Sequence, residues 1–202
     1  MKIFYSATSP YVRKCLVAAH ELGLRDRIEL LPAAPHPVNR DQTVVARNPL
    51  GKIPTLITDD GAILYDSRVV CEYLNMVAGG ALFTGAASAR FTMLAEQSLA
   101  DGMLDAAVLV RYETFTRPES LRWPEWIAGQ TEKVTSGLAE IERRAVGFAA
   151  RIDIGTISIG CALGYLDLRM GELDWRATHP AAAAWFEKFG ARESMRATRP
   201  PA

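Results

Sequence analysis

The first 77 residues alternate between short apolar runs and longer segments in which apolar positions recur with a helical period. Short apolar runs bounded by turn residues are typical of strands, and a period near 3.6 is typical of helices. We predict strands at residues 2–5, 27–31, 55–58 and 62–65, and helices at residues 10–22, 41–47 and 68–77. A strand–helix–strand unit gives a parallel pair, and Asp59-Asp60-Gly61 is typical of a hairpin turn. The order therefore indicates a small mixed sheet with helices packed on it.

The pattern changes at Ala78-Gly79-Gly80-Ala81, a run of small residues of the kind that connects domains. We interpret residues 78–88 as a linker between an α/β domain at residues 1–77 and an all-helical domain at residues 89–202. Beyond the linker, no segment has the pattern of a strand. The predicted fold class is therefore α/β followed by all-α, with a helical bundle as the second domain.

Several segments of the second domain have helical patterns. Apolar positions between Phe91 and Tyr112 recur with a roughly helical period, and residues 126–146 do likewise. Residues 154–168 are apolar on nearly every side, as expected of the central helix of a bundle. Thr178-His179-Pro180 opens a last helix, with Thr178 as its predicted cap and Pro180 in its first turn.

Composition narrows the classes of function. The 202 residues are 49% hydrophobic and 23% charged, with a formal net charge of zero, which is typical of a soluble globular protein. Without a basic excess, we expect no binding to nucleic acid or to an anionic membrane surface. Met1-Lys2 leads directly into a short apolar run without the pattern of a secretory leader, and no segment approaches the length of a membrane span. We expect a cytoplasmic protein.

The three cysteines, Cys15, Cys71 and Cys161, are widely separated and form no Cys-x-x-Cys pair. Because they lie within apolar helical patterns, we interpret them as buried structural thiols in a reducing compartment. We expect no metal site.

Residues 48–56, Asn-Pro-Leu-Gly-Lys-Ile-Pro-Thr-Leu, place a proline at the mouth of a predicted strand. Pro54 cannot donate a hydrogen bond to the sheet, so its neighbour Ile53 keeps backbone groups that the sheet does not fully use. Further along, Asp66 and Ser67 stand at the start of a helix, whose free amides and positive dipole end favour an anion. The combination predicts a cradle for a small zwitterionic peptide. A proline turn followed by an ordinary helix cap has the same pattern.

Ser9 precedes Pro10, which suits the first position of a helix, so Ser9 is the predicted N-cap. A hydroxyl at this place can donate a hydrogen bond to a bound thiolate, and stabilising the anion lowers the pKa of the thiol. The alternative interpretation is a serine that only caps the helix.

Three motifs follow one another along the chain: Ser-Pro-Tyr-Val-Arg-Lys from Ser9, the segment from Asn48 to Leu56, and Asp66-Ser67. With these motifs in this order and spacing, the chain resembles the glutathione S-transferase family over nearly its whole length. It is most similar to small bacterial transferase-like proteins with a serine-type active site. The resemblance implies a thioredoxin-like domain that binds glutathione, followed by a helical domain.

The resemblance also implies roles for individual residues. Pro54 takes the place of the family's cis-proline, and Ile53 pairs its backbone with the cysteinyl part of glutathione. Ser67 binds the γ-glutamyl carboxylate, and Asp66, one methylene shorter than the more frequent glutamate, faces the γ-glutamyl ammonium group. Ser9 matches the serine that donates a hydrogen bond to the sulfur, which makes it the expected catalytic residue.

Other residues remain as alternatives. Thr8 is a rival of Ser9 for the sulfur, and Tyr5 is disfavoured because it falls within the first predicted strand. Lys52, His36 and Arg40 can meet the glycyl carboxylate of glutathione, although each is also interpreted as a solvated loop charge.

The helical domain can contribute as well. Asp101 resembles a residue that reaches into the neighbouring subunit's site in some relatives, but Asp101 and Asp105 on one helix face are also typical of a polar stripe. Arg111, Tyr112 and Phe115 lie further along the same helix, where they either line the pocket for the second substrate or belong to the core.

One departure from the family concerns its sixth helix, which begins with a Ser/Thr-x-x-Asp capping box. This chain reverses the order, with Asp153 first and Thr156 three residues later. Asp153 can still accept hydrogen bonds from the first amides, but a hydroxyl is a weaker acceptor than an acid. We predict a helix start that is formed but less stable.

Together these residues predict a homodimeric enzyme of the glutathione S-transferase type, in which Ser9 stabilises the glutathione thiolate for attack on a small electrophile in detoxification. Glutathione is the cosubstrate, and we expect no further cofactor. One alternative is a glutathione-dependent isomerase, or a thiol reductase that removes glutathione from conjugates. Isomerising relatives have a serine–serine–cysteine cluster that Thr8-Ser9-Pro10 lacks, and no cysteine begins the first helix. Another alternative is a non-catalytic interaction module of the same fold, which has no need of the acid–hydroxyl pair.

Overall fold

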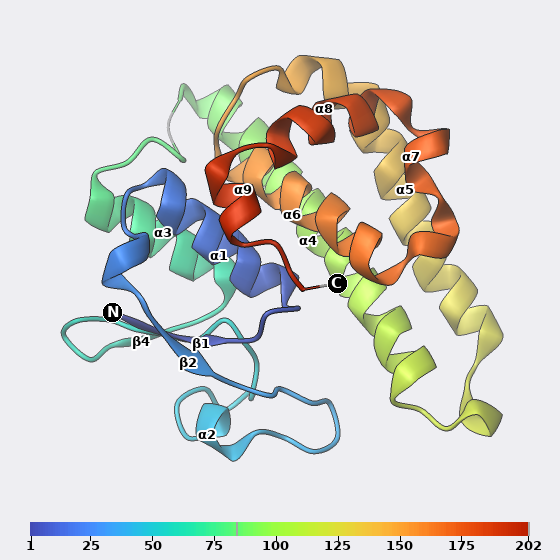
Figure 1. The fold of residues 1–202 in the computed structure, drawn as a ribbon, viewed down its shortest axis with the longest axis horizontal. Coiled ribbons are helices and arrows are strands. Elements are labelled where there is room, and N and C mark those ends of the chain that lie inside the picture. The colour runs from blue at the N-terminus through green and yellow to red at the C-terminus, as the bar shows by residue number, and fades with distance from the viewer. Residues whose placement is uncertain (84, 202) are drawn as a thin grey trace. The chain divides into compact units, whose positions relative to one another are not determined.

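The structure, a computed structural model, describes residues 1–83 and 85–201, and its contacts divide the chain into two compact units (Figure 1). The first unit is Met1–Ala86 together with Glu193–Ala202, and the second is Ala87–Arg192. Among the described residues, every strand belongs to the first unit. The predicted fold class, an α/β domain followed by a helical domain, is confirmed.

A four-stranded mixed sheet with the order β2-β1-β3-β4 forms the framework of the first unit. β1 pairs parallel with β2 and antiparallel with β3, and β3 pairs antiparallel with β4. The strands are β1 Lys2–Tyr5, β2 Glu29–Pro32, β3 Leu56–Ile57 and β4 Ile63–Leu64. The predicted strand–helix–strand unit and the hairpin are therefore both present.

The strands are displaced or shorter than predicted. Residues Arg25–Arg27 form the short 3-10 helix η1, because the Arg25 guanidinium donates to the Ile28 carbonyl at 2.9 Å and keeps the chain turned. β2 therefore begins at Glu29 rather than at residue 27. The turn between β3 and β4 is closed by Gly61, whose φ of +88° suits a glycine.

Helix α1 lies at the centre of the first unit. Residues 12–19 of this helix are all buried, and both α3 and α9 pack against it. Ser9 caps α1 and Pro10 occupies its first turn, as predicted. The helices of this unit are α1 Pro10–Glu21, α2 Gln42–Val45, α3 Ser67–Ala78 and α9 Glu193–Ala197.

The C-terminal residues group with the first unit, whereas we predicted that the helical domain continues to residue 202. The Arg13 guanidinium donates to the Met195 carbonyl at 3.0 Å, and the Ser194 hydroxyl donates to the Glu21 carboxylate. Met195 is only 1% exposed. Contacts between residues more than 170 positions apart bring this segment back to α1. A local sequence pattern cannot predict contacts of this kind. Residue 202 itself lies outside the described residues.

The predicted linker at residues 78–88 is only partly an open connection. α3 ends at Gly79, which adopts a left-handed conformation with φ +58°. A Cβ at Gly80 would lie 2.2 Å from Leu22 Cδ2, so the chain passes close to the end of α1 there, and a larger residue would require the Leu22 side chain to shift. α4 begins at Ala87, and residue 84 of the predicted linker lies outside the described residues.

The second unit is a helical bundle in which α4 packs against both α5 and α6, and Figure 1 shows these helices side by side. Residues 154–163 of α6 are buried without interruption, which confirms it as the central helix. The helices are α4 Ala87–Phe115, α5 Pro124–Phe148, α6 Ile154–Arg169, α7 Trp175–Thr178 and α8 Pro180–Gly190, with 3-10 turns η2 Glu119–Leu121 and η3 Gly171–Leu173.

The cap predicted for the last long helix is wrong. Thr178 ends α7, and the N-cap of α8 is His179, whose side chain makes no capping bond. The Glu142 carboxylate instead accepts hydrogen bonds from the backbone N–H groups of Ala181 and Ala182, at 3.0 and 2.8 Å. An acid from α5 thus satisfies the free amides of α8 and faces the positive end of its dipole.

The start of α6 carries the reversed capping box. Asp153 Oδ1 accepts from the Thr156 N–H at 2.9 Å, and Thr156 Oγ1 accepts from the Asp153 N–H at 3.1 Å. Arg151 binds the Asp153 carboxylate at 2.8 Å and also the buried carboxylate of Glu96 on α4. The predicted helix start is therefore formed, and Arg151 connects it to α4.

We predict that Asp153→Ala lowers the free energy of unfolding by about 1–2 kcal/mol, because α6 loses its cap and Arg151 loses one of its two partners. Chemical denaturation monitored by circular dichroism measures this change. Glu132→Ala, which removes an exposed acid from α5, is the control and should leave the midpoint nearly unchanged. Equal midpoints for Asp153→Ala and the unmodified protein would reject the capping role.

Candidate functional site

Ser9 lies half-buried where the chain passes from β1 into α1. Its Oγ accepts a hydrogen bond from the Val12 N–H at 3.3 Å, which is the capping interaction expected from the sequence. The hydroxyl proton takes no part in this bond, so Ser9 can still donate it to another group. The first amides of α1 lie beside this hydroxyl, at the positive end of the helix dipole.

A buried hydrogen-bond network shapes the loop that precedes β3. The Asn48 side-chain amide donates to the Lys52 carbonyl and to Thr55 Oγ1, both at 3.0 Å, and Asn48 Oδ1 accepts from the Leu50 N–H. Thr55 Oγ1 donates in turn to the Lys52 carbonyl at 2.8 Å. Asn48 is 1% exposed and Thr55 is fully buried. The two side chains hold residues 48–55 in one conformation from the inside.

Ile53 and Pro54 lie at the end of this loop, and the peptide bond between them is cis. Both residues are buried. The next residue, Thr55, accepts a hydrogen bond at its carbonyl from the Phe4 N–H of β1 at 2.9 Å, which is where pairing with the sheet begins. Within the described part of the chain, neither the N–H nor the C=O of Ile53 has a hydrogen-bond partner. Ile53 therefore offers a donor and an acceptor to a ligand.

Asp66 and Ser67 begin α3, as the sequence predicts. Asp66 is the N-cap, with Oδ1 accepting from the Arg68 N–H at 2.9 Å, and its side chain is exposed. Ser67 is 3% exposed, and its hydroxyl has no hydrogen-bond partner among the described residues. The peptide bond between Tyr65 and Asp66 is also cis. The start of α3 thus carries a hydroxyl and the positive end of a helix dipole next to a carboxylate, a combination that suits a ligand with both charges.

The first unit brings these groups together. β1 leads to Ser9 and pairs with β3, which follows Pro54 directly. The Cys15 thiol of α1 lies 3.8 Å from the Ser67 carbonyl and 3.8 Å from the Cys71 sulfur of α3, so the start of α3 lies against α1 (Figure 1). Cys15, Cys71 and Cys161 are all buried, and none of them forms a disulfide among the described residues, which confirms them as buried thiols.

Lys52, His36 and Arg40 were the residues expected to meet the glycyl carboxylate of a ligand. Two of these three have other partners in the structure. His36 Nδ1 accepts hydrogen bonds from the N–H groups of Val38 and Asn39, at 3.2 and 3.0 Å. The Arg40 guanidinium donates to the Pro49 carbonyl and packs over Gly51, so it braces the loop. Lys52 is exposed, and within residues 1–83 and 85–201 its ammonium group has no ion pair.

Asp41 joins two parts of this loop region. Its carboxylate accepts from the Thr43 hydroxyl at 2.6 Å and from the Ala34 N–H at 2.9 Å. These hydrogen bonds hold the pKa of Asp41 below its usual value, the Thr43 hydroxyl contributing most. Asp41 therefore stays ionised, and its hydrogen bonds attach the chain at Ala34 to the start of α2.

The rivals of Ser9, and the residues of the helical domain that were expected to contribute to a site, differ in burial. Thr8 is half-buried in the turn before α1, and Tyr5 belongs to β1. On α4, Asp101 is buried and Asp105 is exposed. Further along α4, Arg111, Tyr112 and Phe115 are not core residues: the first two are half-buried, and Phe115 is 69% exposed with the Arg111 guanidinium 3.8 Å above its ring.

Sequence reasoning missed Asn48 and Thr55, whose side chains hold the loop that contains Ile53. The signal was present: an asparagine directly before Pro-Leu-Gly is typical of the first position of a turn, and its amide can bond the backbone that follows. That Thr55 completes the network depends on its burial, which the sequence does not reveal.

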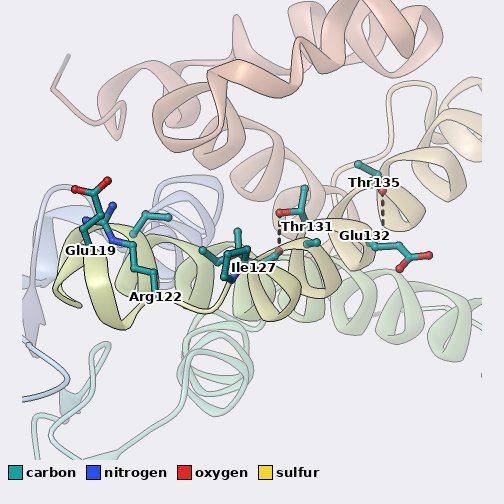
Figure 2. A pocket seen from close by; sticks show the side chains of 9 residues that line it. Glu119, Arg122, Ile127, Thr131, Glu132 and Thr135 are labelled. Carbon is teal, nitrogen blue, oxygen red and sulfur yellow. Dashed lines mark hydrogen bonds between the residues drawn. The ribbon is translucent and has the colours of Figure 1, made fainter.

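A surface groove of the second unit runs along α5 and the chain that precedes it (Figure 2). The hydroxyls of Thr131 and Thr135 in this groove donate to carbonyls of their own helix, so their protons are not available to a ligand. The remaining lining residues are Thr114, Glu119, Arg122, Pro124, Ile127, Ala128 and Glu132. None of the residues predicted to bind a peptide lines this groove.

No group of His, Cys, Asp and Glu side chains among the described residues could hold a metal ion. No helix that the structure describes is long and apolar enough to cross a membrane.

Comparisons with known proteins match both units. Residues 8–76 match the family model "Glutathione S-transferase, N-terminal domain", and residues 124–188 match "Glutathione S-transferase, C-terminal domain". The uncharacterised GST-like protein YibF of Escherichia coli (strain K12) is 32% identical over 205 residues, covering 100% of this chain and 99% of that protein.

Solved structures agree along the whole chain. A glutathione transferase family member from Pseudomonas fluorescens Pf-5 with bound glutathione superposes with a TM-score of 0.97 at 44% identity, covering 100% of this chain and 99% of that one. The same relative with bound S-(propanoic acid)-glutathione gives a TM-score of 0.92, with complete coverage of both chains. A glutathione S-transferase from Methylobacillus flagellatus KT with glutathione bound is 36% identical, with a TM-score of 0.87 and 99% coverage of both chains.

We predict that Asn48→Ala lowers the free energy of unfolding by about 1–3 kcal/mol, because Thr55 Oγ1 and the Lys52 carbonyl lose a buried donor. Urea denaturation measures the change. Asn39→Ala is the matched control, since the Asn39 side chain is exposed in a nearby loop. A midpoint for Asn48→Ala equal to that of the control would mean that the network does not stabilise the loop.

Proposed function

The chain belongs to the glutathione S-transferase family, and on that premise we propose that it binds glutathione in its first unit and activates the thiol for attack on a small electrophile. Two observations together carry the proposal. Within the described part of the chain, the backbone N–H and C=O of Ile53 and the hydroxyl of Ser67 have no hydrogen-bond partner, and both residues belong to the unit whose first helix Ser9 caps. Such groups suit a peptide with a carboxylate at one end.

In the proposed complex, the N–H and C=O of Ile53 pair antiparallel with the cysteinyl residue of glutathione. Pro54 supports this pairing, since it keeps the chain from extending β3 by one more hydrogen bond. The Ser67 hydroxyl and the first amides of α3 bind the γ-glutamyl carboxylate. One oxygen of the exposed Asp66 carboxylate caps α3, and the other oxygen faces the γ-glutamyl ammonium group.

Lys52 is the loop cation best suited to the glycyl carboxylate. Its ammonium group is exposed and has no ion pair within the described chain, whereas His36 and Arg40 already bind backbone groups of their own loops. An exposed pair of this kind adds little affinity, so Lys52 is a minor part of the proposed site.

Ser9 is the proposed catalytic residue. Its hydroxyl donates a hydrogen bond to the glutathione sulfur while its lone pair keeps the capping bond from Val12. This bond and the positive end of α1 stabilise the thiolate, which lowers the thiol pKa and raises the fraction ionised near neutral pH. The thiol proton leaves to water, the sulfur forms a bond to an electrophilic carbon, and a leaving group departs with its electron pair.

The ligands of the relatives support glutathione as cosubstrate and a carbon as the electrophile. The Pseudomonas fluorescens relative holds glutathione in one structure and S-(propanoic acid)-glutathione in the other, in which the sulfur bears a carbon substituent. A conjugate of this kind is what transfer of glutathione to carbon forms.

Thiol–disulfide reduction through a protein cysteine is the less supported alternative. Such chemistry requires an accessible thiolate, and Cys15, Cys71 and Cys161 are all buried. Isomerisation by bound glutathione uses the same cradle, so assays with several substrates must separate it from transfer. A non-catalytic module would have no use for the Ser67 hydroxyl, whose lack of a partner within the described chain favours a ligand.

We also propose that the chain acts in detoxification as a homodimer. Val69 and Met76 of α3 are exposed apolar side chains, 46% and 67% accessible, and a second copy could cover them. Light scattering measures the mass in solution, and a mass equal to one chain would contradict the dimer.

Replacing Ser9 and replacing Ser67 should affect different quantities, the first kcat and the second the Kd of glutathione. We predict that Ser9→Ala lowers kcat for a conjugation reaction about a hundredfold and leaves the Kd of glutathione nearly unchanged, because the sulfur loses a donor that matters most for the thiolate. Ser67→Ala should instead raise the Kd of glutathione about tenfold, since a carboxylate loses a hydrogen bond. Calorimetric titration gives Kd, and steady-state kinetics with an electrophile panel gives kcat.

Two further variants serve as controls for the comparison of Ser9→Ala with Ser67→Ala. Ser136→Ala removes an exposed hydroxyl from α5 and should change neither quantity. Thr8→Ala tests the rival for the sulfur: a loss of kcat in Thr8→Ala without one in Ser9→Ala would transfer the role to Thr8. If the folded, unmodified protein fails to bind glutathione, the proposed function is wrong and the non-catalytic module is favoured.

A further inference from the structure

Two cysteines meet between α1 and α3 in the first unit, where these two helices pack against each other (Figure 1). The Cys71 thiol donates a hydrogen bond to the Cys15 sulfur at 3.8 Å, and the Cys15 thiol donates to the Ser67 carbonyl, also at 3.8 Å. The hydrogen bonds thus form a chain that runs from Cys71 through Cys15 to the first residue of α3. We call Cys15 and Cys71 the thiol pair.

The thiol pair is close to the geometry of a disulfide. A disulfide bond is about 2.0 Å long, so the two sulfurs must approach each other by about 1.8 Å. Rotation about the Cα–Cβ bonds of the two residues moves the sulfurs by distances of this order, so the helices themselves need to shift only slightly. The bond would cross-link two helices whose first turns carry Ser9 and Ser67.

Burial decides which oxidant can reach the thiol pair. Cys15 and Cys71 are both 0% exposed, so a disulfide of peptide size cannot approach either sulfur for thiol–disulfide exchange. Hydrogen peroxide is scarcely larger than a water molecule, and it reaches a buried sulfur during the local openings that folded proteins undergo. The thiol pair therefore suits a slow response to peroxide and does not suit repeated turnover as a reductase.

We propose that the thiol pair is an oxidation site, at which hydrogen peroxide converts Cys15 and Cys71 to a disulfide. The sulfur of one thiol attacks the peroxide and breaks the O–O bond, and the departing hydroxide takes the thiol proton, which gives a sulfenic acid and water. The sulfur of the other thiol then attacks the sulfenic sulfur, and the departing hydroxide takes the second proton. In total, two thiols and one peroxide give one disulfide and two waters.

The contact between the two sulfurs determines this product. A sulfenic acid without a thiol beside it is oxidised further to a sulfinic acid by a second peroxide. In the thiol pair, the second thiol is already at 3.8 Å, so its attack is intramolecular and precedes the second peroxide.

The disulfide acts on the candidate site through Ser67. In the reduced protein the Cys15 thiol donates to the Ser67 carbonyl, and a disulfide has no proton to donate. Drawing α3 toward α1 also displaces the first turn of α3, where Asp66 and Ser67 lie. The oxidised protein should therefore bind glutathione less tightly than the reduced protein. This effect rests on the proposed function, whereas formation of the disulfide does not.

Formation of the disulfide is tested first, in the folded protein treated with hydrogen peroxide. The remaining thiols are blocked with iodoacetamide in urea, and the protein is digested with trypsin. Because trypsin cleaves on both sides of each cysteine, residues 15–25 and 69–90 should appear as one linked peptide that has lost two hydrogen atoms. Of the three cysteines, only Cys161 should carry the blocking group.

Matched variants show whether the contact is required. Cys71→Ser and Cys71→Ala each remove one sulfur of the thiol pair and should abolish the linked peptide. Cys161→Ser makes the same change at another fully buried position, in the second unit, and should leave the linked peptide unchanged. Protein unfolded in urea before the peroxide is added should lose the preference for Cys15 with Cys71. Circular dichroism confirms that each variant is folded before and after treatment.

The effect on the candidate site is tested with S-methylglutathione, which has no thiol that could reduce the disulfide. Calorimetric titration should give a Kd about fivefold higher for the oxidised than for the reduced protein, because a hydrogen bond to the start of α3 is lost. Cys71→Ser treated with peroxide should keep the Kd of the untreated variant, which separates the cross-link from oxidation of methionine. Reduction of the oxidised protein with dithiothreitol should restore the lower Kd.

The outcomes separate the two proposals. Three blocked cysteines after peroxide treatment, a sulfinic acid in place of the linked peptide, or links to Cys161 as frequent as the link between Cys15 and Cys71 would each overturn the oxidation site. A linked peptide with an unchanged Kd supports the oxidation site and overturns its effect on glutathione binding. If the linked peptide forms but the reduced protein does not bind S-methylglutathione, the oxidation site stands and the proposed function fails.

Discussion

The burial of residues 12–19 of α1 is the constraint on which the first unit depends. Because none of these residues is exposed, other segments must cover them, and both α3 and the returning C-terminal segment pack against α1. Arg13 is tolerated in this position because the carbonyl of Met195 accepts its hydrogen bond. With α1 enclosed in this way, Ser9 at its start and Ser67 at the start of α3 belong to one packed body.

The candidate site in that unit consists largely of backbone groups, and buried side chains position them. Ile53 contributes its N–H and C=O, while Asn48 and Thr55 hold the loop that presents them. A site of this type recognises the backbone of a peptide and is insensitive to what is attached to its sulfur. In the proposed function, selection of the electrophile must therefore depend on other residues.

Features with a strong local cause were predicted well. Pro10 and Gly61 impose their own backbone geometry, so the start of α1 and the turn of the hairpin followed from a few neighbouring residues. Features that depend on distant partners were not. Thr178 looked like a cap, but Glu142, nearly 40 positions earlier, supplies the carboxylate. The grouping of α9 with the first unit did not follow from the sequence pattern, because its partners on α1 lie more than 170 positions away.

The sequence alone determined the order of strands and helices, the division into an α/β part and a helical part, and the residues Ser9, Ile53, Pro54, Asp66 and Ser67 as candidates, since proline, caps and turns act over a few bonds. Only the tertiary structure decided which of these groups lack a partner and which are engaged. Among the residues that the structure describes, it left the Ser67 hydroxyl and the backbone groups of Ile53 without a hydrogen-bond partner, whereas the Arg40 guanidinium donates to the Pro49 carbonyl. Whether a polar group is free depends on its neighbours in space, and packing between distant segments sets those neighbours.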